Sequence, residues 1–119
     1  MALATCPYNT GTRMPEPKKT RRQMLEEFVA LKPDDPFSRY GLAMECANSG
    51  DRTAADEHFR ALLDKNVDYL PAYLMYGQFL VRESRPAEAK QVLESGVRVA
   101  LKKGDAHARS ELEALLGEL

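Results

Sequence analysis

Candidate nucleophiles, bases and metal ligands are few in this chain of 119 residues, which contains two histidines and two cysteines. His58 and His107 fall on the polar sides of different predicted helices, and no Ser or Cys stands where either imidazole would activate it. Cys6 and Cys46 form neither a CxxC pair nor a Cys/His spacing that suits zinc, and two cysteines are too few for a disulfide framework. We expect Cys46 to be a small apolar core residue and Cys6 to be an exposed thiol.

The carboxylates and the loop motifs of the sequence also indicate no catalysed reaction. The glutamates are dispersed over outer helix faces, where carboxylates ordinarily interact with solvent: Glu26, Glu27, Glu83, Glu88 and Glu94. The sequence has no GxGxxG or GxxxxGK[ST] loop to hold phosphates and no HExxH to hold zinc. We therefore expect a protein that is not an enzyme and that binds no cofactor and no metal.

Charge and hydropathy limit the classes of partner. The formal net charge is −1 at pH 7 and the pI is about 6.1, so no overall positive field attracts nucleic acid or anionic lipid. No window approaches the roughly 18 apolar residues of a membrane span, and no apolar signal sequence precedes Cys6. We expect a cytoplasmic protein that binds neither nucleic acid nor membrane.

The elements that must position any site repeat along the chain at a fixed spacing. Leu25 returns 34 residues later as Phe59 and again as Leu93, and the small residue Ala43 returns as Gly77. Self-similarity of this length is typical of a helical repeat array. No alternating run bounded by turn signals predicts a strand, so we expect an all-α fold.

Capping residues and prolines divide the chain. Thr20 and Gln23 have the spacing of a capping box, and Thr53 is predicted to cap the third helix. Asp35 is a good cap before Pro36. The sequence predicts a flexible N-terminal arm at 1–18 and a domain at 19–119. Within the domain we expect a half-repeat helix at 19–33, a first repeat at 36–69, a second repeat at 70–103 and a capping helix at 105–119.

The segment from Pro36 to about Lys103 resembles two consecutive tetratricopeptide (TPR) units of the small bacterial type. Small residues stand where the family's helices cross closely: Ala43, Ala55, Gly77 and Ala89. Bulky residues stand where the family has them: Leu42, Phe59, Tyr73, Tyr76 and Leu93. The resemblance implies a right-handed α-solenoid of antiparallel helix hairpins, with about six helices including a C-terminal cap.

Two positions depart from the family pattern. Arg39 replaces a bulky residue in the first unit, and we expect its apolar stem to pack while Phe37 supplies the missing bulk. Gly96 stands where the second unit usually has Ala. Neither departure removes the agreement in register of the other positions.

In the family the first helix of every unit lines the concave surface, and the resemblance carries this to eight partner-binding residues: Phe37, Tyr40, Met44, Asn48, Leu74, Gln78, Val81 and Arg82. They imply a shallow apolar groove, with an amide and a guanidinium at its edge, that suits an extended peptide or a partner helix. Alternatively, Tyr40 and Met44 pack against the N-terminal helix, or the arm occupies the groove. The family's clamp for carboxylate-ended chaperone tails is not expected, because its positions hold Tyr40, Met44 and Met75.

The sequence therefore predicts a non-enzymatic protein–protein interaction module, an adaptor, scaffold or assembly factor whose partner is a protein or peptide. The alternative is a homo-oligomerising structural subunit that buries its apolar faces against another copy. A helical-repeat RNA binder is a third possibility, which the lack of a basic face disfavours.

Overall fold

The computed structural model describes residues 19–119, and in that range it contains six α-helices and no strand, which confirms the all-α prediction. The helices are α1 (Arg21–Leu31), α2 (Pro36–Asn48), α3 (Arg52–Lys65), α4 (Leu70–Arg82), α5 (Pro86–Lys103) and α6 (Ala106–Gly117). The arm predicted at 1–18, with the thiol of Cys6, lies outside the described residues. No helix between residues 19 and 119 is long and apolar enough to cross a membrane.

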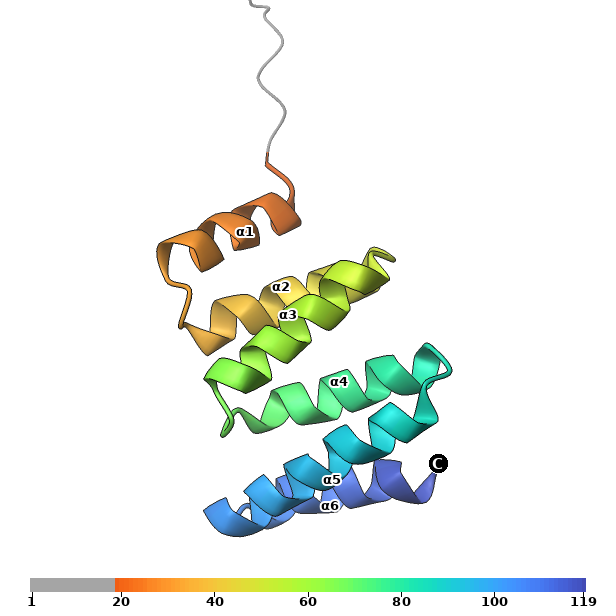
Figure 1. Ribbon diagram of the computed structural model, residues 1–119. Helices are drawn as coiled ribbons and strands as arrows, with labels where there is room; N and C mark the ends of the chain where they lie inside the picture. The colour runs from red at the N-terminus through yellow and green to blue at the C-terminus, as the bar shows by residue number, and fades with distance from the viewer. Residues whose placement is uncertain (1–18) are drawn as a thin grey trace, which may run out of the picture.

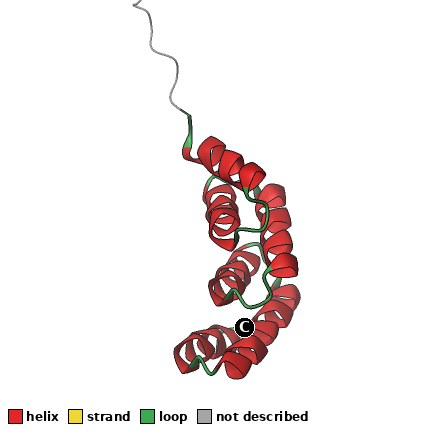
Figure 2. Cartoon of the chain, turned by 90° about the vertical axis from the view of Figure 1, so that its left-hand side faces the viewer, coloured by secondary structure: helices red, strands yellow, loops and turns green. Residues whose placement is uncertain are grey.

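Successive helices run antiparallel and stack from α1 to α6 (Figure 1). They form two rows, with α1, α3 and α5 in one and α2, α4 and α6 in the other (Figure 2). The stack bends toward the row of α2, α4 and α6, so this row lines its concave side (Figure 2). Contacts within the row join α2 to α4 and α4 to α6.

Local capping sets where several helices begin and end. The Thr20 hydroxyl accepts a hydrogen bond from the Gln23 backbone N–H at 3.1 Å, and the Gln23 side chain accepts one from the Thr20 backbone at 2.8 Å. The predicted capping box is therefore confirmed. Asp35 caps α2 by accepting from the Ser38 N–H at 3.2 Å, and Gly104 ends α5 in the left-handed region with φ of 71°.

The cap predicted for the third helix was wrong. Thr53 already lies inside the first turn of α3, and Asp51 is the cap, because its Oδ1 accepts the Ala54 N–H at 3.2 Å. Gly50, with φ of 86°, turns the chain out of α2 and brings Asp51 to the helix start. Arg22 then fixes the same carboxylate, with its Nη1 2.8 Å from the Asp51 Oδ2.

Two connected clusters form the core. The bulky residues of the repeat pattern are all buried, and Phe59 stacks on Tyr76 with ring centroids 5.1 Å apart. The four small residues of the pattern are buried where the helices cross. Cys46 is fully buried as predicted, and burial raises the pKa of its thiol. Each large apolar side chain that is fully buried contributes roughly 1.5–3 kcal/mol.

The structure accounts differently for the two departures from the repeat pattern. Arg39 is half-buried and its Nη2 donates to the Pro33 carbonyl at 3.3 Å, but Phe37 is 73% exposed and supplies no core bulk, so that part of the prediction was wrong. Gly96 is required by close packing. A Cβ at this position would lie 2.7 Å from the Tyr73 Cβ and 3.1 Å from a Leu112 methyl.

Candidate partner-binding surface

The eight residues predicted to bind a partner all lie on α2 and α4, in the row that lines the concave side. Three of them are half-buried: Tyr40, Met44 and Leu74. Five are exposed: Phe37, Asn48, Gln78, Val81 and Arg82. The half-buried members are all apolar or aromatic, as a shallow apolar surface requires.

Tyr40 partly fills the space between α2 and α4. Its ring packs on Tyr69, the residue before α4, with centroids 5.5 Å apart and planes tilted by 59°. Burial raises the pKa of the Tyr40 phenol, and the nearby Tyr69 adds to this effect. Met44 packs against the core cluster that contains Leu42 and Cys46. Both side chains therefore support the fold while one side of each remains accessible.

A pocket of about 240 Å³ lies one step further along the concave row, between α4 and α6. Its lining is mostly apolar: Leu70, Pro71, Leu74, Met75, Ala108 and Leu112, with Asp105, His107 and Glu111. Leu74 is the one residue of this lining that was also predicted from the sequence. The contribution of α6 was missed, because that helix was interpreted as a cap.

The polar residues of this pocket come from the start of α6. Asp105 caps the helix by accepting the Ala108 N–H at 3.0 Å, and the His107 Nε2 lies 3.5 Å from the Glu111 Oε1. The spacing of His107 and Glu111 is four residues, which places both on one side of the helix. The sequence spacing therefore predicts that the two side chains lie together on the polar side of this helix, but it does not predict that they line a pocket with α4.

The comparisons with known proteins agree with this architecture. No family model matches the chain. The TPR repeat-containing protein PA0015 of Pseudomonas aeruginosa is 27% identical over 95 residues, which are 80% of this chain and 90% of that protein. The crystal structure of a tetratricopeptide repeat domain protein from Salinibacter ruber is 30% identical, covers 71% of this chain and 93% of its own, and superimposes with a TM-score of 0.65. This chain belongs to the tetratricopeptide repeat family.

A second solved structure extends the likeness. The solution structure of protein BPP2914 from Bordetella parapertussis is 30% identical, covers 85% of this chain and 88% of its own, and has a TM-score of 0.72. TPR proteins are generally non-catalytic, and their fold indicates a protein-interaction module.

A partly exposed polar network around the buried Tyr76 holds three helices of the TPR stack together. The Asp56 carboxylate accepts from the Tyr76 hydroxyl at 2.5 Å and lies 3.1 Å from Arg60 and 3.4 Å from Arg85. Burial and the Asp56 carboxylate raise the pKa of Tyr76, while the hydrogen bond from Arg60 opposes the shift. Arg85 also makes two hydrogen bonds of 2.7 Å with Glu88. The network joins α3, α4 and α5.

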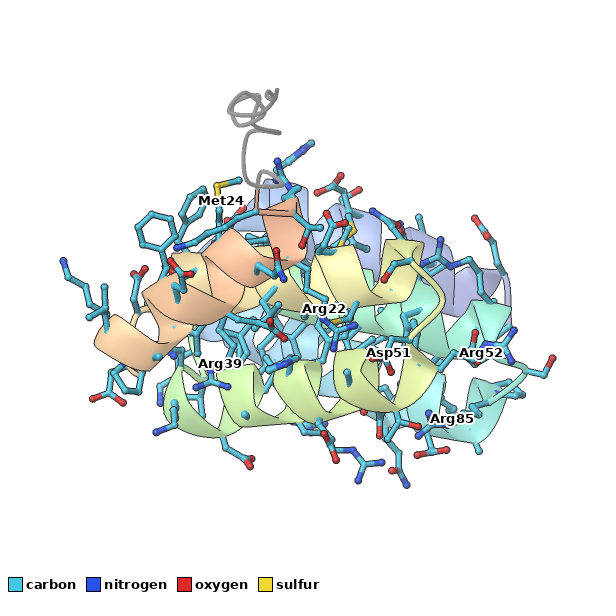
Figure 3. The ribbon with its side chains drawn as sticks, turned by 90° about the horizontal axis from the view of Figure 1, so that it is seen from above. Arg22, Met24, Arg39, Asp51, Arg52 and Arg85 are labelled. Atoms are coloured by element: carbon cyan, nitrogen blue, oxygen red, sulfur yellow. The ribbon has the colours of Figure 1, made fainter. Side chains whose placement is uncertain are left out.

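The first helix of the TPR stack has one anchored side and one exposed side. In Figure 3 the Arg22 side chain points toward Asp51, and Met24 lies on the opposite side of α1. Hydrogen bonding from Arg22 lowers the pKa of the Asp51 carboxyl. Met24, Phe28 and Leu31 are 45%, 57% and 78% exposed, so residues 19–119 leave an apolar strip uncovered along α1.

Proposed function

We propose that this TPR protein is a non-enzymatic interaction module, an adaptor, scaffold or assembly factor that binds a peptide or a partner helix along its concave row. The observation that carries the proposal is the apolar pocket between α4 and α6, which continues the half-buried surface of Tyr40, Met44 and Leu74. Small-molecule sites usually enclose about 300 to 1,000 Å³. A pocket of about 240 Å³ that opens on a surface suits a side chain of a partner better than a free metabolite.

The division of the chain into units is part of the same proposal. We assign α2 with α3 and α4 with α5 to the two complete TPR units, α1 to an incomplete unit that precedes them, and α6 to the cap. The 34-residue register supports this division, since Leu25, Phe59 and Leu93 occupy equivalent positions in α1, α3 and α5. We also propose that the protein works in the cytoplasm.

The test is affinity capture from the native lysate with variants of the concave row. Tyr40→Ala/Met44→Ala/Leu74→Ala removes the half-buried surface, and Phe37→Ala/Val81→Ala removes two exposed apolar side chains at little cost in stability. We expect the wild type to recover a partner that the triple variant loses and that the double variant binds less. Recovery of the same proteins by all three would refute the groove.

A matched control separates loss of the groove from loss of the fold. Gln91→Ala/Glu94→Ala/Arg98→Ala truncates three exposed side chains of α5, in the other row. This control variant should recover the same partner as the wild type. Circular dichroism and thermal melting must show that the triple concave variant remains folded at the capture temperature, because two of its positions pack against the core.

Self-association through α1 is the second candidate function, and the exposed strip of Met24, Phe28 and Leu31 favours it. In the repeat register Phe28 corresponds to Leu62, which is fully buried, whereas among residues 19–119 nothing covers Phe28 to the same extent and it is 57% exposed. A second copy would cover the strip. Light scattering should then give a dimer mass that Phe28→Glu converts to a monomer mass. A monomer at high micromolar concentration would exclude self-association as the main function.

A further inference from the structure

We infer that the pocket between α4 and α6 selects a partner segment in which an apolar anchor side chain stands beside a lysine or arginine. The inference rests on the proposed function, because it specifies the ligand of the same concave surface. It is carried by the combination of an apolar base with carboxylates at the opening.

The base of the pocket is held in place by the core. Leu70 and Leu112 are 7% and 1% exposed and belong to one core cluster, and Leu74 packs against that cluster. Leu112 is further fixed by its close approach to Gly96 of α5. Side chains that are already ordered lose little entropy when a ligand binds, so the pocket is preorganised for an aliphatic anchor.

The charged side chains that line the opening are acidic. Asp105 and Glu111 line the pocket, and no Lys or Arg does so among the residues that the structure describes. Glu118 follows Glu111 by seven residues, which is two helical turns, and therefore lies just beyond the end of α6 on the same side. A cation held beside the anchor would meet the carboxylates of Asp105 and Glu111 at short range.

The nearby cations are directed elsewhere. The Lys103 Nζ donates to the Asp68 carbonyl at 3.0 Å, in the loop between α3 and α4. Arg109 pairs with Glu113 at 3.2 Å. His107 is the one basic side chain of the lining, and it already lies 3.5 Å from Glu111. Among the described residues, neither Asp105 nor Glu111 is therefore paired with a lysine or arginine.

This charge pattern distinguishes between kinds of peptide. A chain-terminal carboxylate or an acidic segment would be repelled at the pocket, since like charges brought together are unfavourable. Arg82, the cation predicted at the edge of the groove, ends α4 and does not line the pocket. A basic apolar segment gains both burial of its anchor and attraction to the carboxylates.

The experiment uses the whole chain and three probe peptides, acetylated and amidated octapeptides whose centres read Lys-Leu-Leu-Lys, Gln-Leu-Leu-Gln and Glu-Leu-Leu-Glu. Titrations followed by amide chemical shifts of the labelled protein should show perturbation at Leu74, His107 and Leu112. We expect the lysine probe to bind about fivefold more tightly than the glutamate probe at low salt, with the glutamine probe between them. High salt should reduce this ratio toward one.

Glu111→Gln tests the origin of the preference, because it removes one carboxylate without removing the cap at Asp105. This substitution should lower the ratio of the affinities for the lysine and glutamate probes to about twofold. The matched control is Glu94→Gln, which makes the same charge change at an exposed position on α5 and should leave the ratio unchanged.

The possible failures can be told apart. Equal binding of the three probes at Leu74 and Leu112 would overturn the charge selection and leave the groove intact. A preference that Glu111→Gln does not alter would overturn the role given to the pocket. Failure of every probe to perturb the concave row would overturn the inference, and affinity capture with the concave variants would then decide separately whether the proposed function fails as well.

Discussion

Replacing Gly96 by alanine gives the sharpest test of the packing described above, because the substitution restores the residue that TPR units usually have. Alanine in the middle of a helix is favoured over glycine by about 1 kcal/mol, so sequence considerations alone predict a stabilised protein. The structure predicts the opposite. The new methyl group would lie 2.7 Å from the Tyr73 Cβ, well inside the separation of about 3.5–4.0 Å at which carbon atoms attract.

Whether Gly96→Ala stabilises or destabilises the protein depends on whether the neighbours of the new methyl group can move away. The Tyr73 Cβ is fixed to the backbone of α4, and the Tyr73 hydroxyl donates to the Val67 carbonyl at 2.8 Å, so both ends of the side chain are held. Relief would require α4 and α5 to separate. Overpacking in a rigid core costs about 1–3 kcal/mol. After subtraction of the gain in helix propensity, we expect Gly96→Ala to destabilise the protein by up to about 2 kcal/mol, a fall in Tm of up to about 15 °C for a domain of this size.

Gly41→Ala provides the control with the same chemical change. A Cβ at Gly41 would meet a Leu25 methyl at 3.1 Å, and that methyl is the free end of a half-buried side chain that can rotate. We expect Gly41→Ala to melt at or above the temperature of the wild type, while Gly96→Ala melts below it. Thermal melts followed by circular dichroism at 222 nm measure both. A Gly96→Ala protein as stable as the wild type would refute the argument from close packing.

Three further changes test other parts of the stack. Asp56→Ala removes the acceptor of the Tyr76 hydroxyl and the partner of two partly exposed arginines, and it should lower stability by about 0.5–1.5 kcal/mol in urea unfolding, whereas Glu57→Ala at an exposed position should have little effect. Burial first, and then nearby arginines, lower the pKa of His58 in the folded state. The unfolded chain therefore binds more protons below about pH 6.5, so Tm should fall as the pH drops from 7.5 to 5.5. His58→Gln should reduce that fall. Gly77→Leu would overlap a buried leucine of α5 and should cost about 1–3 kcal/mol or more, so an unchanged Tm would contradict the assigned register.

The helices were predictable because a repeat sequence records the same packing several times. Leu25, Phe59 and Leu93 identify one position in three helices, and a chance match at one of them would not reproduce the others. The capping box of Thr20 and Gln23 was predictable because its partners are close in sequence. The cap of α3 was not, since Asp51 and Thr53 both suit such a position and the choice between them depends on the turn of the preceding chain and on Arg22 of α1.

Residues whose role depends on neighbours distant in sequence could be identified from the sequence, but their role could not be explained from it. Gly96 was visible as a departure from the repeat, yet the reason for it lies in Tyr73 of α4 and Leu112 of α6. The exposure of Phe37 depends in the same way on what the folded chain places over it. A repeat register identifies equivalent positions, but it does not say which neighbours occupy the space around them.

The pocket between α4 and α6 was missed for a related physical reason. Its α4 side follows the register, so Leu74 was found, while its α6 side lies beyond the last repeated unit, where His107 and Glu111 have no counterparts to compare. The position of α6 is set by packing of Leu112, with Ala108, Leu115 and Leu116, against the preceding hairpin. That packing places Asp105 and Glu111 in the lining of the pocket beside α4.

The side-chain network of Asp56 and the pocket between α4 and α6 differ in how fully their polar groups are paired. The carboxylate of Asp56 is satisfied by cations and a hydroxyl from its neighbours, so this network has little left to offer to a partner and instead joins α3, α4 and α5. The pocket between α4 and α6 has the opposite character, because Leu74 and Met75 are only half-buried and, in the part of the chain that the structure describes, Asp105 and Glu111 are not paired with a lysine or arginine. A rigid scaffold that presents exposed apolar surface beside carboxylates should bind most tightly a ligand that brings an apolar side chain and a cation to the same place. We therefore expect substitutions in α6, the helix outside the repeat, to change partner specificity more than substitutions at the repeated positions that define the fold.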